Sequence, residues 1–312
     1  MPELPEVEIT RRGLLPLIDS SVTNVVIRNA SMRWPIPAHL PQTLNNQTLV
    51  SLKRRAKYIL AEFSHQNNDL SNCQLASPLA VHCIDKKQVA QLNDFTPTIN
   101  NNFITGTLLL HLGMSGRISL LDRYYPPEKH DHFDLMFNDG RVLRLRDPRR
   151  FGAVLWAGLE PQNHALLLPL GPEPLEETFN PTYLFNALLK RNTAIKISIM
   201  DSHLVVGVGN IYASESLFRA GIHPETPAKN VTLKQCIQLV MHIKVTLNDA
   251  LNAGGSSLRD FYGVDGNIGY FQQEYFVYAR TNEPCKVCSQ PIKCIRLGQR
   301  STFFCANCQM PL

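Results

Sequence analysis

Two C-x-x-C pairs in the last thirty or so residues constrain the fold of this chain more than any other feature. The pairs consist of Cys285, Cys288, Cys305 and Cys308, with sixteen residues between them. Each pair can direct two thiolates to one tetrahedral metal ion, and a closed shell of four sulfur ligands is typical of a structural zinc site. Two redox-active dithiols are the alternative, but both pairs occurring at this distance favour zinc. The spacing therefore predicts one structural Zn²⁺ ion.

The segment between the two pairs is expected to form a β-hairpin finger. Residues 291–297 and 301–305 read as short strands, and Gly298 lies where the turn is needed. Arg300 is then expected near the tip of the finger. Cys294 also falls in this segment, and the pattern leaves open whether its thiol lies near the metal.

The 312 residues are enough for two domains, each with its own core. A helix is expected over residues 5–18, with a buried stripe of Val7, Leu14, Leu15 and Ile18. From residue 22 to 156 the sequence consists mostly of short alternating runs broken by Gly, Pro and Asn, a pattern that favours a β-sandwich or barrel. The clearest runs are residues 22–26, 58–63, 107–112, 133–137 and 153–156.

Helical periodicity replaces this pattern after residue 161, over residues 182–191, 211–220 and 233–251. The predicted fold class is α+β, with a β-sandwich and flanking helices followed by a helical domain and the zinc finger. The predicted boundaries are 1–168 for the first domain, 169–175 for the linker, 176–275 for the helical domain and 276–312 for the finger.

Gly207, Gly209 and Asn210 lead directly into the second of these helices. Glycines allow a close approach of the backbone to an anion, and a helix start presents free N–H groups, so this start is a candidate phosphate site that Asn210 could cap. An ordinary helix start is the alternative.

Two segments are expected to be loops. Residues 65–103 carry many asparagines and are interpreted as a surface insertion between two strands, in which Cys73, His82 and Cys83 lack metal-ligand spacing. Residues 254–269 are rich in glycine and could either close over a ligand or simply connect two elements.

The sequence begins Met1-Pro2-Glu3, and removal of Met1 would leave a proline with a free secondary amine. An α-amino group has a pKa of about 7.7 to 8.0, so part of it is uncharged and nucleophilic at neutral pH. Attack on a sugar C1′ would give an iminium ion that acts as an electron sink, and the Glu3 carboxyl could donate a proton at the same centre. The alternative is a frayed terminus without function.

The net charge of +5 is small, but the basic residues form clusters with few acidic neighbours. This clustering favours a polyanionic partner, although solvated faces would explain any one cluster. The clusters contain Lys53, Arg54, Arg55 and Lys57; Arg141, Arg144, Arg146, Arg149 and Arg150; Lys190, Arg191 and Lys196; and Lys286, Lys293, Arg296 and Arg300. Neither a signal peptide nor a transmembrane run is expected, which predicts a cytoplasmic protein without a membrane partner.

Several long motifs together resemble the bacterial formamidopyrimidine-DNA glycosylase family, which repairs oxidised purines in DNA. They span nearly the whole chain apart from the 65–103 insertion. The matching stretches are residues 2–8, 54–58, 111–116, 129–132, 147–152 and 205–215, followed by the finger. Residues 264–270, expected over the flipped base, differ at several places from the family pattern.

The resemblance implies roles for individual residues. Pro2 corresponds to the Schiff-base nucleophile and Glu3 to the acid. Lys57 corresponds to the lysine that contacts phosphate and assists β-elimination, and Arg300 to the arginine that grips phosphate and assists δ-elimination. Met114, Arg149 and Phe151 correspond to the trio that fills the gap left by the flipped nucleotide. His130, Arg191 and Asn210 correspond to positions that contact DNA, and Asn210 begins the second helix of a helix-two-turn-helix.

The resulting prediction is a monomeric bifunctional DNA glycosylase and β,δ-lyase that excises 8-oxoguanine or formamidopyrimidines from damaged double-stranded DNA. An endonuclease VIII-like enzyme for oxidised pyrimidines is one alternative, which Leu4 and the Met114, Arg149 and Phe151 trio disfavour. A zinc-finger protein that binds DNA without catalysis is the other.

Overall fold

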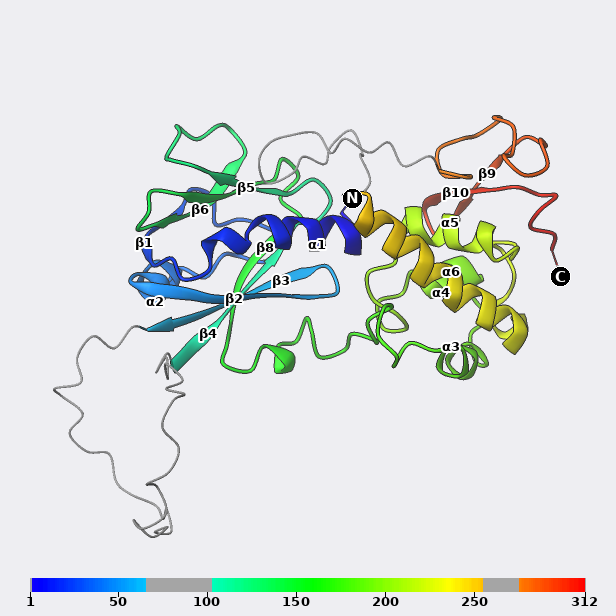
Figure 1. Cartoon of the computed structure of the whole chain (residues 1–312), viewed down its shortest axis with the longest axis horizontal. Coiled ribbons are helices and arrows are strands. Elements are labelled where there is room, and N and C mark those ends of the chain that lie inside the picture. The colour runs from blue at the N-terminus through cyan, green and yellow to red at the C-terminus, as the bar shows by residue number, and fades with distance from the viewer. Residues whose placement is uncertain (1, 66–102, 255–274, 312) are drawn as a thin grey trace, which may run out of the picture.

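The structure, a computed structural model, describes residues 2–65, 103–254 and 275–311 of the chain (Figure 1). In chain order, the described residues form a β-sandwich, a helical unit and a small β-hairpin, which agrees with the predicted α+β class. The sandwich and the helical unit have separate clusters of buried hydrophobic side chains. Leu4 lies in the helical cluster, although the predicted division assigns it to the first domain. The other predicted boundaries stay predictions.

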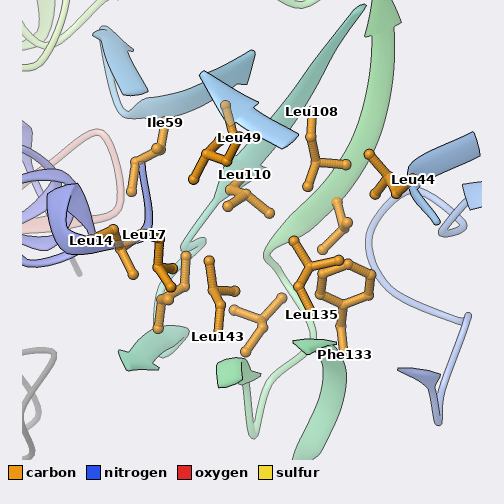
Figure 2. Close-up of a cluster of buried hydrophobic side chains, with 14 of the residues drawn as sticks. Leu14, Leu17, Leu44, Leu49, Ile59, Leu108, Leu110, Phe133, Leu135 and Leu143 are labelled. Atoms are coloured by element: carbon orange, nitrogen blue, oxygen red, sulfur yellow. The ribbon is translucent and has the colours of Figure 1, made fainter. Parts of the chain in front are cut away.

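Two four-stranded antiparallel sheets form the sandwich, and buried leucine, isoleucine and phenylalanine side chains fill the space between them (Figure 2). The first sheet has the order β1 (Val22–Ile27), β6 (Asp131–Phe137), β7 (Val142–Arg146), β5 (Arg117–Leu121). The second has the order β2 (Gln47–Arg55), β3 (Tyr58–His65), β4 (Phe103–His111), β8 (Ala153–Gly158). The predicted runs correspond to β1, β3, β4, β6 and β8, whereas β2, β5 and β7 were not among them. The predicted sandwich is confirmed.

Strands β3 and β4 pair with His65 opposite Phe103, so the segment between them starts and ends at neighbouring strand ends. An insertion between two strands is expected to do this. Residues 66–102, with Cys73, His82 and Cys83, lie outside the described residues, as do residues 255–274 of the glycine-rich loop.

The first helix, α1 (Leu4–Gly13), ends five residues before its predicted end. A short 3-10 helix follows at Leu15–Leu17. Pro16 explains the early end, because proline has no N–H for the bond to the Arg12 carbonyl and its ring would clash with that carbonyl in a continuing α-helix. The buried stripe also differs from the prediction, because Leu17 is buried and Leu15 is exposed.

The helical unit contains α3 (Pro181–Leu188), α4 (Ile195–Ile199), α5 (Asn210–Arg219) and α6 (Leu233–Asn252). Helix α3 ends three residues before its predicted end, and the five-residue α4 was not predicted because so short an element shows no periodicity. Helix α5 packs against α6 and is buried along most of its length. Minor elements are α2 (Leu40–Leu44) and 3-10 turns at Pro161–Asn163 and Ala228–Asn230.

The predicted finger is a hairpin of β9 (Lys293–Leu297) and β10 (Arg300–Phe304). Gly298 and Gln299 form its turn with φ of 51° and 62°. Positive φ at both central residues matches the twist of a tight two-residue hairpin. Arg300 therefore lies beside the tip, as expected. No helix in the described part of the chain has the length and hydrophobicity needed to cross a bilayer.

Candidate active site and nucleic-acid interface

The carboxylate of Glu3 is buried against the amino-terminal end of α5. It accepts the backbone N–H groups of Gly209 at 2.7 Å and Ile211 at 3.0 Å. The N–H of Glu3 itself donates to the Glu6 carboxylate at 2.8 Å, and the Tyr212 hydroxyl donates to the same carboxylate at 2.8 Å. A carboxylate at this end of a helix satisfies unpaired N–H groups and interacts favourably with the helix dipole. The start of the chain is thereby attached to the helical unit.

The two glycines before α5 make room for residues from the start of the chain. A Cβ on Gly209 would lie 2.2 Å from Cδ of Glu3, and one on Gly207 would lie 2.6 Å from Cβ of Leu4. The sequence predicted that the N–H groups at this helix start could bind phosphate. That prediction is wrong, because the N–H groups of Gly209 and Ile211 already donate to the Glu3 carboxylate.

The expectation that Asn210 caps the helix is also wrong. Gly209 is the capping residue, and Asn210 is the first residue of α5. The Asn210 side chain instead accepts a hydrogen bond from Lys196 Nζ at 2.7 Å and donates one to the Ser301 carbonyl at 3.0 Å. It thus connects α4, α5 and the finger. The prediction that it begins a helix is confirmed.

Lys57 lies in the two-residue turn between β2 and β3, directly before the predicted run at 58–63. Burial lowers the pKa of Lys57, the charges of Glu3 and Glu6 raise it, and that of Arg300 lowers it. Burial likewise raises the pKa of Glu3, and the charge of Lys57 opposes this. The start of the chain, the β2–β3 turn and the finger are thus close enough for their charges to interact, and α1 packs against both β2 and β3. Pro2, directly before Glu3, is partly buried there.

Of these groups, Arg300 also lines a cavity of about 510 Å³, whereas Pro2, Glu3 and Lys57 are not among its lining residues. The predicted gap-filling trio and Arg300 all contribute to its wall, so the structure brings four predicted site residues together. The lining residues are Ser31, Met32, Arg33, His111, Gly113, Met114, Arg149, Arg150, Phe151 and Arg300. The Arg149 guanidinium lies 4.8 Å from the centre of the Phe151 ring, and Phe151 is 41% exposed. An exposed aromatic ring on a cavity wall is available for contact with a partner.

One buried carboxylate, that of Asp147, holds the two loops that carry the trio. It accepts the Ser115 hydroxyl at 2.7 Å and the Gly152 N–H at 2.8 Å. A Cβ on Gly113 would lie 2.4 Å from the Phe151 backbone, so the loops pack closely enough to require glycine there. These contacts fix the relative positions of Met114 and Phe151.

His111 also lines the cavity and was not among the predicted site residues. Its Nδ1 accepts the Gly113 N–H at 3.1 Å. Burial, together with the charges of Lys57 and Arg33, lowers the pKa of His111 to about 4, so its ring is neutral at pH 7. Its position at the start of the 111–116 motif was the signal that could have identified it.

His130 and Arg191 lie outside the wall of this cavity. His130 precedes β6, with its ring 6.3 Å from that of His132. Arg191 follows α3 and pairs with Asp201 at 2.7 Å. The DNA contacts of these residues therefore stay predictions.

The structure shows which of the clustered basic residues are already bound to acidic side chains. In the first two clusters, several of the cations bind acidic side chains of the same protein. The ion pairs join Arg54 and Arg55 to Glu173, Arg141 to Asp139, Arg144 to Asp131 and Asp134, Arg146 to Asp131, and Lys53 to Glu62. Lys196 is fully buried. By contrast, Arg33, Arg149, Arg150 and Arg300, all on the cavity wall, form no ion pair with another described residue. The cavity wall therefore carries four arginines whose charge is available to a polyanion.

The four predicted zinc ligands come together in the finger, with their ligand atoms within 4.8 Å of one another. The Sγ atoms of Cys285 and Cys308 are 3.9 Å apart and those of Cys288 and Cys305 3.4 Å apart. Zn–S bonds of about 2.3 Å in a tetrahedron place the sulfur atoms about 3.8 Å apart, so the geometry fits one structural zinc ion. Cys294 is exposed on β9 and lies outside this group.

Family models match three consecutive parts of the chain. They are the formamidopyrimidine-DNA glycosylase N-terminal domain over residues 1–154, the H2TH domain of the same enzyme over 170–262, and the zinc finger found in FPG and IleRS over 282–309.

Curated relatives match over nearly their full length. The formamidopyrimidine-DNA glycosylase of Methylobacillus flagellatus is 59% identical over 309 residues, covering 99% of this chain and 96% of that protein. The enzyme of the same name from Herminiimonas arsenicoxydans is 47% identical, covering 99% and 100%. Among solved structures, the MutM (Fpg) protein of Thermus thermophilus superimposes with a TM-score of 0.78 at 30% identity over 100% of both chains. A Lactococcus lactis Fpg mutant bound to DNA containing Fapy-dG gives 0.81 at 28% identity, over 99% of this chain and 100% of that one.

Proposed function

This chain belongs to the formamidopyrimidine-DNA glycosylase family, and we propose that Pro2, Glu3, Lys57 and Arg300 carry out its chemistry. It is a base-excision-repair glycosylase, with the abasic-site lyase activity and the preference for oxidised purines that are typical of the family. The substrate is damaged duplex DNA, in which 8-oxoguanine and formamidopyrimidines are the lesions expected. The observation that supports the residue assignments best is the proximity of Glu3, Lys57 and Arg300, whose charges act on one another, with Arg300 in the cavity wall.

In the proposed first step, the amine of Pro2, freed by removal of Met1, forms a bond to C1′ of the flipped nucleotide while the bond from C1′ to the base breaks. The base leaves with the bonding electrons and requires a proton. Glu3 is suited to donate a proton at this centre, because burial raises its pKa and favours the protonated form. The Pro2 nitrogen then loses its N–H proton, and its lone pair forms a double bond to C1′ as the C1′–O4′ bond of the sugar ring breaks and O4′ takes up a proton. The resulting open-chain iminium withdraws electrons from the C2′–H bond.

Lys57 and Arg300 have the proposed roles in strand cleavage. Burial lowers the pKa of Lys57 and so increases its neutral fraction, which can accept the C2′ proton while the 3′ phosphate leaves. Arg300 lines the cavity and forms no ion pair with another described residue, so its guanidinium can bind phosphate and assist the second elimination.

Met114, Arg149 and Phe151 have the proposed role of filling the space that the flipped nucleotide vacates. An apolar side chain can insert between bases, and an arginine can hydrogen-bond the base that has lost its partner. His130, Arg191 and Asn210 have the proposed role of contacting the DNA backbone. We further propose that the protein acts as a monomer in the bacterial cytoplasm.

Borohydride trapping tests the proposed nucleophile. The purified protein is incubated with duplexes containing either 8-oxoguanine or thymine glycol, and the trapped adduct is mapped by mass spectrometry. The expected result is an adduct on the 8-oxoguanine duplex, attached to Pro2. Trapping on thymine glycol alone would indicate a pyrimidine enzyme, the absence of any adduct a protein that only binds DNA, and a crosslink at another residue a different nucleophile.

A further inference from the structure

Glu173, in the segment between the two domains, has its carboxylate buried against the turn that carries Lys57. It is 7% exposed. One carboxylate oxygen accepts the backbone N–H of Ala56 at 2.6 Å and Nη1 of Arg55 at 2.9 Å. The other accepts Nη1 of Arg54 at 2.6 Å. A single acidic side chain therefore binds three consecutive residues, 54, 55 and 56, directly before Lys57.

These contacts fix the peptide bonds on both sides of Ala56. Its N–H is held by Glu173, and its carbonyl accepts Nη1 of Arg54 at 3.0 Å. Ala56 has a φ of 54°, a left-handed conformation that non-glycine residues adopt only when their surroundings impose it. The carbonyl of Ala56 belongs to the peptide bond that leads into Lys57, so these hydrogen bonds determine the direction in which Lys57 leaves the backbone.

The same interdomain segment is attached to the helical unit. The N–H of Gly171 donates to the Ser202 carbonyl at 2.8 Å, and the N–H of Val206 donates to the Pro172 carbonyl at 3.2 Å. Residues 202–206 directly precede the glycines that receive Leu4 and Glu3. Glu173 thus lies between the turn that presents Lys57 and the loop that leads to the binding place of Glu3.

We propose that Glu173 is a positioning residue for strand cleavage: its carboxylate sets the backbone from which Lys57 reaches the abasic sugar, and it does so from the segment that joins the domains. This inference rests on the proposed function of Lys57 in elimination. A buried acid between two arginines could instead serve stability alone. The two roles differ in their consequences, because loss of stability affects both steps of the reaction, whereas misplacement of Lys57 affects the step that follows attack by Pro2.

The experiment compares the full-length, zinc-loaded wild type with Glu173→Gln, Lys57→Ala and the double variant. Two rates are measured on a duplex with a preformed abasic site: formation of the borohydride-trappable adduct, which reports attack by Pro2, and strand nicking, which reports elimination. Glu177→Gln, an exposed acid close by in the chain, is the matched control. Thermal unfolding and zinc content are measured for every variant.

Glu173→Gln is expected to slow nicking about ten- to hundredfold, as displacements of about 1 Å do, while adduct formation stays within about twofold of wild type. In the double variant, nicking should be no slower than with Lys57→Ala alone, because residues that act through one another give non-additive effects. Glu177→Gln should match the wild type in both rates.

The results distinguish a failure of the proposed function of Lys57 from a failure of the inference about Glu173. If Lys57→Ala leaves nicking unchanged, the proposed function of Lys57 is wrong. If Lys57→Ala slows nicking but Glu173→Gln does not, or if the two effects multiply, the inference about Glu173 is wrong while the function of Lys57 stands. If Glu173→Gln does not fold, Glu173→Asp provides the test, since it retains the charge but shortens the reach to Ala56. Equal loss of both rates in a folded variant would overturn the inference.

Discussion

Glu3 and Gly209, 206 positions apart in the sequence, are joined by a 2.7 Å hydrogen bond from the Gly209 N–H to the Glu3 carboxylate. This contact holds Glu3, the residue next to the proposed nucleophile Pro2, against the amino-terminal end of α5. The α5 helix thereby orients an acid that belongs to the first domain. The proposed active site thus combines residues from the start of the chain with the start of α5, and its geometry depends on how these parts are held together.

Gly209→Ala is expected to lower base excision about a hundredfold or more. The added Cβ would lie 2.2 Å from Cδ of Glu3 and must displace the carboxylate, and displacements of about 1 Å at a reacting centre cost about this much. Single-turnover excision of 8-oxoguanine is the measurement. Gly140→Ala is the contrast: its Cβ would meet no atom within 4 Å, but φ is 88° there, so this variant should lose thermal stability without losing the excision rate of the folded protein. Equal rates for Gly209→Ala and the wild type would contradict the proposed role of Glu3.

The pH dependence of base excision should reveal the environment of Glu3. Burial raises its pKa above the ordinary 4.5, so the proton is bound more tightly in the folded protein. The contribution of Glu3 to the free energy of unfolding therefore falls as the pH rises from 4.5 towards the raised pKa. The rate of base excision, if it requires protonated Glu3, falls as the pH passes through the same pKa. The positive charge of Lys57 lowers the pKa of Glu3.

Lys57→Met should therefore shift the alkaline fall in the excision rate to higher pH. Lys53→Met, at an exposed lysine paired with Glu62, should leave it in place. Single-turnover rates across pH 4 to 9 or so provide the comparison. A shift to lower pH, or no shift, would show that Glu3 is not the acid whose deprotonation causes the alkaline fall in the excision rate.

Phe151→Ala should lower base excision while leaving the fold intact. The ring is 41% exposed, so its removal is expected to change the free energy of unfolding by less than about 1 kcal/mol. Loss of contact with DNA bases, worth about 1 to 3 kcal/mol, corresponds to a rate about ten- to hundredfold lower. Leu159→Ala, at a 66% exposed leucine outside the cavity, is the control. An unchanged excision rate with Phe151→Ala would remove this residue from the proposed trio.

Arg300→Ala should weaken DNA binding and slow nicking while base removal persists. Arg300 lines the cavity without an ion pair to another described residue, so one phosphate contact is expected to be lost. The slope of log binding constant against log salt should become less steep by about 0.9. Arg141→Ala is the contrast, because Arg141 is paired with Asp139 and should not change the slope. Titrations at several salt concentrations decide between the two outcomes.

Cys305→Ser should abolish stoichiometric zinc binding, and Cys294→Ser should not. Cys305 belongs to the four-sulfur group, whereas Cys294 is exposed outside it. Without zinc the hairpin that carries Arg300 loses its main constraint, so DNA binding should fall together with the metal content. Zinc content and duplex affinity are the measurements. Full zinc content in Cys305→Ser would show that the ligand set is wrong.

Local patterns predicted much of this architecture. The cysteine spacing identified the zinc ligands, and alternation in short runs indicated the sandwich, because both depend on residues close together in the chain. The same reasoning extended α1 past Pro16 and missed α4, because a helix end depends on backbone geometry and five residues show no period. The motifs that carried the family resemblance identified the cavity trio, but His111, within one of them, was overlooked.

The sequence by itself determined the ligands of the metal, the class of fold and the family, since each depends on residue types at fixed spacing. Only the tertiary structure decided which polar groups are already satisfied. Arg54 and Arg55 look available to phosphate until Glu173, more than a hundred positions away, binds them, and the N–H groups before α5 look open until Glu3 occupies them. Electrostatic and hydrogen-bond partners are chosen by distance in space, so they emerge only when the chain has folded.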